Sequence, residues 1–135
     1  MILALKQLLA EFKANTLIAV EFSADPLADR MLVPEARLAL FHIAQEALSN
    51  AARHSRASRI EVKLIDNAAD VVLLLKDNGR GFDPDKIERR LGHGLMNMRD
   101  RVSAIRGELT IDGQNHGTEV RVRVPKELLG PVQVW

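Results

Sequence analysis

The chain lacks cysteine and tyrosine, and its 135 residues include only one tryptophan and four phenylalanines. Without cysteine it can form no disulfide and offers no thiolate to a metal ion. So few aromatic side chains leave little for unpaired bases to stack on, which argues against a binder of single-stranded nucleic acid. Acidic and basic residues nearly cancel, to a net charge of +1. We therefore expect no broad positive field and no nucleic-acid partner.

Long apolar runs are also missing, so we expect no segment to span or contact a membrane. The opening MILALKQLLAEF is interrupted by Lys6 and Glu11 and lacks the cleavage pattern of a signal peptide. The length suggests a single domain over residues 1–135 that buries a core without covalent staples. Residues 126–135 are expected to form a loosely ordered tail.

Apolar periodicity predicts the order of helices and strands. ADPLADRMLVPEARL, with two prolines, is expected to be a loop leading into a helix that starts at Pro34. The predicted helices cover 2–14, 34–54, 84–90 and 95–106, the last ending at Gly107, and the predicted strands cover 17–22, 58–65, 70–76, 108–112 and 118–124. Strands of alternating polarity imply a sheet with one solvated face. The expected fold class is an α/β (α+β) two-layer sandwich, with a mostly antiparallel mixed sheet covered on one face by helices.

The longest predicted helix has two unlike faces at 100° per residue. Its apolar arc is expected to pack on the sheet and contains Leu40, Phe41, Ala44, Ala47, Leu48, Ala51 and Ala52. The opposite arc carries Gln45, Glu46, Ser49, Asn50 and Arg53, with His42 and His54 at its edges. Each residue alone is typical of a solvated face. Together, a carboxylate, an amide and a cation at i, i+4 and i+7 suit Mg²⁺ and substrate phosphates.

Glycine-containing stretches lie next to three of the predicted elements. DNGRGFD, at 77–83, comes after a buried strand and is first of all a turn. LGHGLMNMRD, at 91–100, places a Gly-x-Gly before a helix, where backbone N–H groups can face an anion. Gly117 and Thr118 begin the last strand, and such pairs are usually hairpin chemistry. Residues 83–94 are predicted to be the most mobile internal segment and to form a lid.

Four stretches carry a family resemblance: QEALSNAARH (45–54), DNGRGF (77–82), GHGLMNMRDR (92–101) and GTEVRVRVP (117–125). In this order and spacing they resemble the catalytic ATP-binding domain of two-component sensor histidine kinases, in the subgroup of the nitrate and membrane-fluidity sensors. The resemblance covers roughly residues 16–125. This family shares a superfamily with gyrase, the Hsp90 chaperones and the mismatch-repair ATPases. The resemblance implies a reason for the polar residues in the DNGRGFD turn, which is that this turn would hold adenine.

The resemblance also implies a role for individual residues. Glu46 and Asn50 would be catalytic, with Asn50 as the Mg²⁺ ligand, and Asp77 would accept the adenine amino group. The ATP-binding set it implies is Asn50, Arg53, His54, Asp77, Gly79, Gly81, Gly92, Gly94, Leu95 and Thr118. The implied activity is donation of the γ-phosphoryl group of Mg-ATP to a histidine on a separate helical domain, in two-component signal transduction.

The chain departs from the family pattern in one important respect. It has no dimerisation helix with a phosphoacceptor histidine, so the implied partners are ATP, that helical domain of the same kinase and, indirectly, a response regulator. The implied location is the cytoplasm, or the cytoplasmic part of a membrane-anchored sensor. Three alternatives stay open: an anti-sigma-factor serine kinase, an ATPase module of the gyrase or Hsp90 type, and a degenerate nucleotide sensor.

Overall fold

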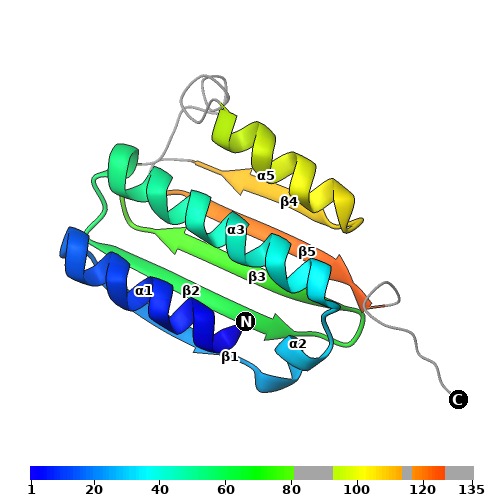
Figure 1. Ribbon diagram of the computed structural model, residues 1–135. Helices are drawn as coiled ribbons and strands as arrows, with labels where there is room; N and C mark the ends of the chain where they lie inside the picture. The colour runs from blue at the N-terminus through cyan, green and yellow to red at the C-terminus, as the bar shows by residue number, and fades with distance from the viewer. Residues whose placement is uncertain (81–92, 114–116, 127–135) are drawn as a thin grey trace, which may run out of the picture.

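The computed structural model is a two-layer sandwich of a five-stranded sheet and helices (Figure 1). The structure describes residues 1–80, 93–113 and 117–126, with the backbone alone at residues 54, 55 and 93. The strand order is β1-β2-β3-β5-β4. The bounds are Ala19–Ala24 for β1, Arg59–Asp66 for β2, Asp70–Asp77 for β3, Glu108–Asp112 for β4 and Glu119–Pro125 for β5. Only β1 and β2 pair in parallel, which confirms the mostly antiparallel sheet.

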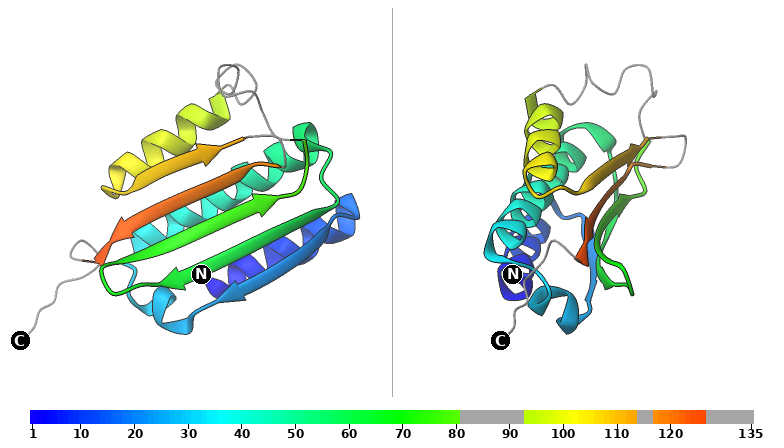
Figure 2. Two further views of the ribbon diagram at one scale, coloured as in Figure 1. Left: turned by 180° about the vertical axis from the view of Figure 1, so that it is seen from behind. Right: turned by 90° about the vertical axis from the view of Figure 1, so that its right-hand side faces the viewer.

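The helices cover one face of this sheet, as Figure 2 shows in its side view. They are α1 (Ile2–Thr16), α3 (Pro34–Asn50) and α5 (His93–Ala104). Leu40 and Ile43 of α3 are fully buried, and so is Val62 of β2. Burial alternates along β2 because every second side chain faces the helices and is shielded from water. None of the helices in the described ranges is long and apolar enough to cross a membrane.

The other face of the sheet, which we call the open face, is turned to the viewer in the left view of Figure 2. By the strand register its charged residues are Glu21, Arg59, Glu61, Lys63, Asp70, Lys76, Glu108, Asp112, Glu119, Arg121 and Arg123. Ion pairs run across it: Arg59 with Glu21, and Arg123 with both Asp70 and Glu108.

One expected loop contains a helix instead. Residues Pro26–Arg30 form α2, capped by Asp25, whose Oδ1 accepts a hydrogen bond from the Leu27 N–H at 3.0 Å. Proline at the first helical position fits this start because its missing N–H would have no partner there. The prediction of an unbroken loop before Pro34 was therefore wrong, although α3 does begin at Pro34.

The ends of the two long helices also differ from expectation. After Asn50, α3 continues as a π-helical turn, η1 (Ala51–Ser55), and this wider winding leaves Ala52 exposed instead of packed on the sheet. Helix α5 begins two residues earlier than predicted. At its far end, Arg106 and not Gly107 takes the left-handed conformation, with φ of 55°. Gly107 is needed for space, because a Cβ there would lie 2.9 Å from the carbonyl oxygen of Arg123.

Candidate functional site

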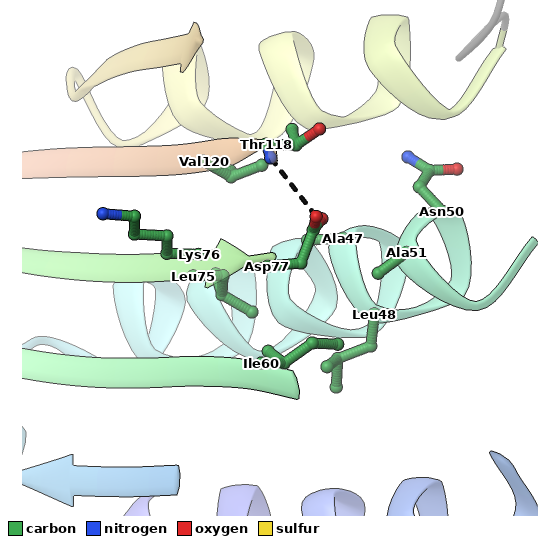
Figure 3. A pocket seen from close by; sticks show the side chains of 10 residues that line it. All are labelled: Ala47, Leu48, Asn50, Ala51, Ile60, Leu75, Lys76, Asp77, Thr118 and Val120. Carbon is green, nitrogen blue, oxygen red and sulfur yellow. Dashed lines mark hydrogen bonds between the residues drawn. The ribbon is translucent and has the colours of Figure 1, made fainter. Parts of the chain in front are cut away.

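A pocket opens between the C-terminal part of α3 and the ends of the central strands (Figure 3). Its lining residues come from four parts of the sequence: Ala47, Leu48, Asn50, Ala51, Ile60, Leu75, Lys76, Asp77, Thr118 and Val120. Small alanines on the helix leave room, while Ile60, Leu75 and Val120 provide apolar walls. Such a lining, mostly apolar with a few polar groups at its edge, is typical of a site for a small molecule.

Strand alternation explains how polar side chains enter this pocket. In β3 the inward row is Val71, Leu73 and Leu75, and Asp77 is the next member of that row. Thr118 stands in the same way before Val120, Val122 and Val124 of β5. Both polar residues therefore continue an apolar row toward the helices, and they are only 7% exposed.

The Asp77 carboxylate is held by two backbone N–H groups. Gly79 donates to Oδ1 at 2.8 Å and Thr118 donates to the same oxygen at 3.2 Å. Among the described residues Oδ2 accepts no hydrogen bond, so it keeps its acceptor capacity. Burial raises the pKa of Asp77, and the two N–H donors only partly oppose this. A buried carboxylate with a free oxygen is suited to accept a hydrogen bond from a ligand amino group.

Thr118 adds a second unsatisfied group. Its Oγ1 is buried without a hydrogen-bond partner in the part of the chain that the structure describes. Such groups are uncommon in native structures, and a ligand is one ordinary explanation. The preceding residue, Gly117, has φ of 127°, and a Cβ there would lie 1.9 Å from the carbonyl oxygen of Asp77. Gly117 therefore lets β5 approach Asp77 closely enough for the two to bond.

On the helix side, the predicted polar track is present. Arg53 Nη2 donates to Asn50 Oδ1 at 3.1 Å and lies 3.7 Å from Glu46 Oε2. Asn50 was expected on the polar, outward arc, but it is only 6% exposed and lines the pocket. Arg53 is exposed, and the backbone of His54 lies in η1.

These residues fit Mg²⁺ by the chemistry of their donors. A guanidinium cation already lies against Asn50 Oδ1 beside the Glu46 carboxylate, so the position favours positive charge. No group of three or more His, Cys, Asp or Glu side chains gathers within the described ranges. An ion here would depend on oxygens from water and from a phosphate ligand, which is how Mg²⁺ usually binds.

Helix α5 meets the same track at its first turn. A Cβ on Gly94 would lie 2.2 Å from Glu46 Oε2, so this glycine lets α5 approach the carboxylate. A groove of about 350 Å³ continues between α3 and α5, lined by His42, Gln45, Glu46, Ser49, Asn97, Met98 and Arg101. Leu95 is part of the hydrophobic core and does not line the pocket, so any ligand contact would use its backbone.

Several predicted features lie outside the described residues. They are Gly81, Gly92, the short helix over 84–90, the lid over 83–94 up to residue 92, and the tail from 127 onward; the His54 side chain is not described either. Gly117 was predicted only as part of a Gly-Thr pair, and Asn78 only as part of a turn. The signal for Gly117 was present, since glycine directly before an inward-facing threonine marks a close approach.

Comparisons with known proteins agree with this geometry. Residues 35–128 match the family described as histidine kinase-, DNA gyrase B- and HSP90-like ATPase. The chain is 41% identical over 103 residues to the signal transduction histidine-protein kinase/phosphatase DegS of Bacillus subtilis, covering 74% of this chain and 27% of that protein. It is 37% identical over 131 residues to the sensor histidine kinase MctS of Rhizobium johnstonii, covering 96% and 28%.

A nitrate sensor and a solved structure give the same picture. The nitrate/nitrite sensor protein NarX of Escherichia coli is 37% identical over 109 residues, covering 79% of this chain and 18% of that protein. The histidine kinase domain of a blue-light activated kinase from Erythrobacter litoralis superposes with a TM-score of 0.75 at 22% identity, covering 93% of this chain and 67% of that chain. The chain thus spans less than a third of each of these three curated relatives.

Proposed function

The chain belongs to the family of histidine kinase-, DNA gyrase B- and HSP90-like ATPases, and we propose that it is the ATP-binding catalytic domain of a sensor histidine kinase. One observation carries the proposal. The three buried polar or charged residues in the described ranges are Asn50, Asp77 and Thr118, and all three line the same pocket. Buried polar groups are costly unless something satisfies them, so their convergence indicates a ligand.

The residues would divide the nucleotide between them. Asp77 Oδ2 would accept the adenine amino group, Thr118 Oγ1 would supply a second polar contact, and Ile60, Leu75 and Val120 would pack against the ring. Asn50 would hold Mg²⁺ against the phosphates, while Arg53 and His54 would contact phosphate oxygens. When bound, Mg²⁺ would neutralise charge that develops on the transferring phosphoryl group.

The acceptor would be a histidine on a separate helical domain of the same kinase. The bond between the γ-phosphorus and the bridging oxygen breaks, a phosphorus–nitrogen bond forms on the imidazole, and ADP leaves. Glu46 lies between the metal position and the groove toward α5, where it can orient the attacking group. We place this domain in the cytoplasm, with a response regulator as the indirect recipient of the phosphoryl group.

An assay with γ-labelled ATP tests this function. We expect the chain alone to bind ATP, to hydrolyse it slowly and to acquire no acid-labile label, because the accepting histidine is proposed to lie on a separate helical domain and transfer needs it in line with the γ-phosphate. Adding the helical domain of the parent kinase should give acid-labile phosphohistidine on that domain. Rapid stoichiometric self-labelling would contradict the proposal, and acid-stable label on an added protein would indicate a serine kinase.

A further inference from the structure

Asn78 directly follows the buried Asp77, yet its side chain turns back to another strand. Its Oδ1 accepts hydrogen bonds from the backbone N–H groups of Ser58 at 2.9 Å and Arg59 at 3.0 Å. Its Nδ2 donates to Ser58 Oγ at 3.0 Å, and its own backbone N–H donates to the Arg59 carbonyl at 3.2 Å. One side chain thus bonds three groups that lie 19 or 20 residues earlier in the chain.

Asn78 does not line the pocket in which a nucleotide would bind. It is exposed and borders a hollow with Arg59, Glu61 and Lys76, and the side chains of these last three lie on the open face. Any effect of Asn78 on a ligand must therefore be transmitted through its neighbours, and the nearest of these is Asp77.

Of the two segments that Asn78 joins, the one with Ser58 is fixed independently. The Ser58 carbonyl accepts from the Ala19 N–H at 2.9 Å, and Arg59 is paired with Ala19 where β1 and β2 begin. By contrast, β3 ends at Asp77, which is paired with Ile60, and Asn78 and Gly79 lie beyond the end of the strand. The asparagine therefore fastens the turn to the sheet.

We propose that Asn78 is a positioning residue that holds the Asp77–Gly79 turn against the start of β2, so that the Asp77 carboxylate is correctly placed to bind adenine. The identity of the ligand rests on the proposed function, whereas the hydrogen bonds of Asn78 do not depend on it. With the turn fixed, the Gly79 N–H stays on Asp77 Oδ1, and the carboxylate stays in the wall of the pocket. Without the asparagine, the carboxylate loses this constraint and spends part of its time in other orientations.

Three variants separate this role from a general contribution to folding. Asn78→Ala removes both the acceptor and the donor. Asn78→Asp keeps an oxygen for the Ser58 and Arg59 N–H groups and can accept from the Ser58 hydroxyl, so it should rescue the function. Asn67→Ala is the matched control, because Asn67 is also an exposed turn asparagine, bonded to Asp70 at 2.9 Å at the opposite end of β3.

Two measurements on the whole chain are needed: the dissociation constant of ADP by calorimetry, and amide hydrogen exchange at Gly79 and Val122 without ligand. For Asn78→Ala we expect ADP binding weaker by about fivefold or more, which is the scale of a lost hydrogen bond, and faster exchange at Gly79 but not at Val122. Asn78→Asp and Asn67→Ala should stay within about twofold of wild type in both measurements.

Three results would overturn the inference: unchanged ADP affinity in Asn78→Ala, equal losses in Asn78→Ala and Asn78→Asp, or an equal loss in Asn67→Ala. If the wild-type chain itself binds no ADP, the proposed function fails instead. Gly79 exchange then still decides whether Asn78 holds the turn, because unchanged exchange in Asn78→Ala would reject the role.

Discussion

The pocket and the open face are built on the same strands, but they differ in how their carboxylates are exposed and paired. On the open face, carboxylates are exposed and paired with arginines, as in Glu21 with Arg59 and Glu108 with Arg123. In the pocket, Asp77 is buried and bonded only to backbone N–H groups in the described ranges. Exposed pairs add little stability, whereas a buried unpaired carboxylate costs stability. The cost of burying Asp77 is therefore explained by its proposed role in binding the nucleotide.

The largest expected effect separates two carboxylates of one strand. Asp77→Asn should weaken ATP binding by roughly 2–4 kcal/mol, because an amide N–H then faces the adenine amino group and a charge-assisted bond is lost. Asp70→Asn, at the other end of β3, is the matched control and should bind ATP like wild type. Calorimetric titration measures both. If the two variants bind equally well, the pocket has no special role for its carboxylate.

The next effect distinguishes the metal position from the rest of the helix surface. Asn50→Ala should weaken ATP binding in Mg²⁺ by about 10–100-fold, the range found for residues that support metal sites, and should weaken metal-free ADP binding less. Ser49→Ala, an exposed neighbour on the same helix, serves as the control. Equal losses for Mg-ATP and metal-free ADP would show that Asn50 does not bind the metal.

A smaller effect should appear in the pH dependence of stability. The pKa of Asp77 is raised in the folded protein. Between the ordinary carboxyl pKa and this raised pKa, the native state therefore holds a proton that the unfolded chain has released. The ligand-free protein therefore gains stability as pH falls from above the raised pKa toward the ordinary carboxyl value. Asp77→Asn lacks this group, so its stability advantage over wild type should shrink over that window. Urea unfolding of both proteins at several pH values measures it, and a constant difference would contradict the burial cost.

The smallest effect belongs to the open face. Asp70→Asn removes one partner of Arg123, which retains Glu108, and should change the free energy of unfolding by only about 0–1 kcal/mol. Denaturant unfolding measures this change. A loss as large as that of a buried core residue would mean that the open face is not the weakly coupled region described here.

Most of the fold could be predicted from the sequence because apolar periodicity reports burial directly. The strands were found within about two residues, and so was the start of α3. Helix α2 was missed although Asp25-Pro26 is a cap followed by proline, a usual signal for the start of a helix. The π-helical turn after Asn50 accounts for another difference, because it shifts the faces of the helix and this shift is not visible in a 100° pattern.

The site was predictable as a set of motifs but not as a geometry. Family motifs gave Asp77, Asn50 and Thr118, and the inward rows of β3 and β5 explain in hindsight why the first and last are buried. The Gly117 approach and the Asn78 bonds depend on segments that are about 20 or 40 residues apart in sequence. No local pattern predicts which strands will meet, so these contacts required the structure.

The most direct test of the central claim is a map of backbone amide chemical shifts as ADP and Mg²⁺ are added to the isotope-labelled chain. The account predicts that the amides of Ala51, Gly79 and Thr118 shift strongly, while those of Lys63 and Arg121 on the open face stay in place. Shifts concentrated on the open face, or no saturable shifts at the pocket residues, would contradict the claim that the buried polar residues form an adenine-nucleotide site.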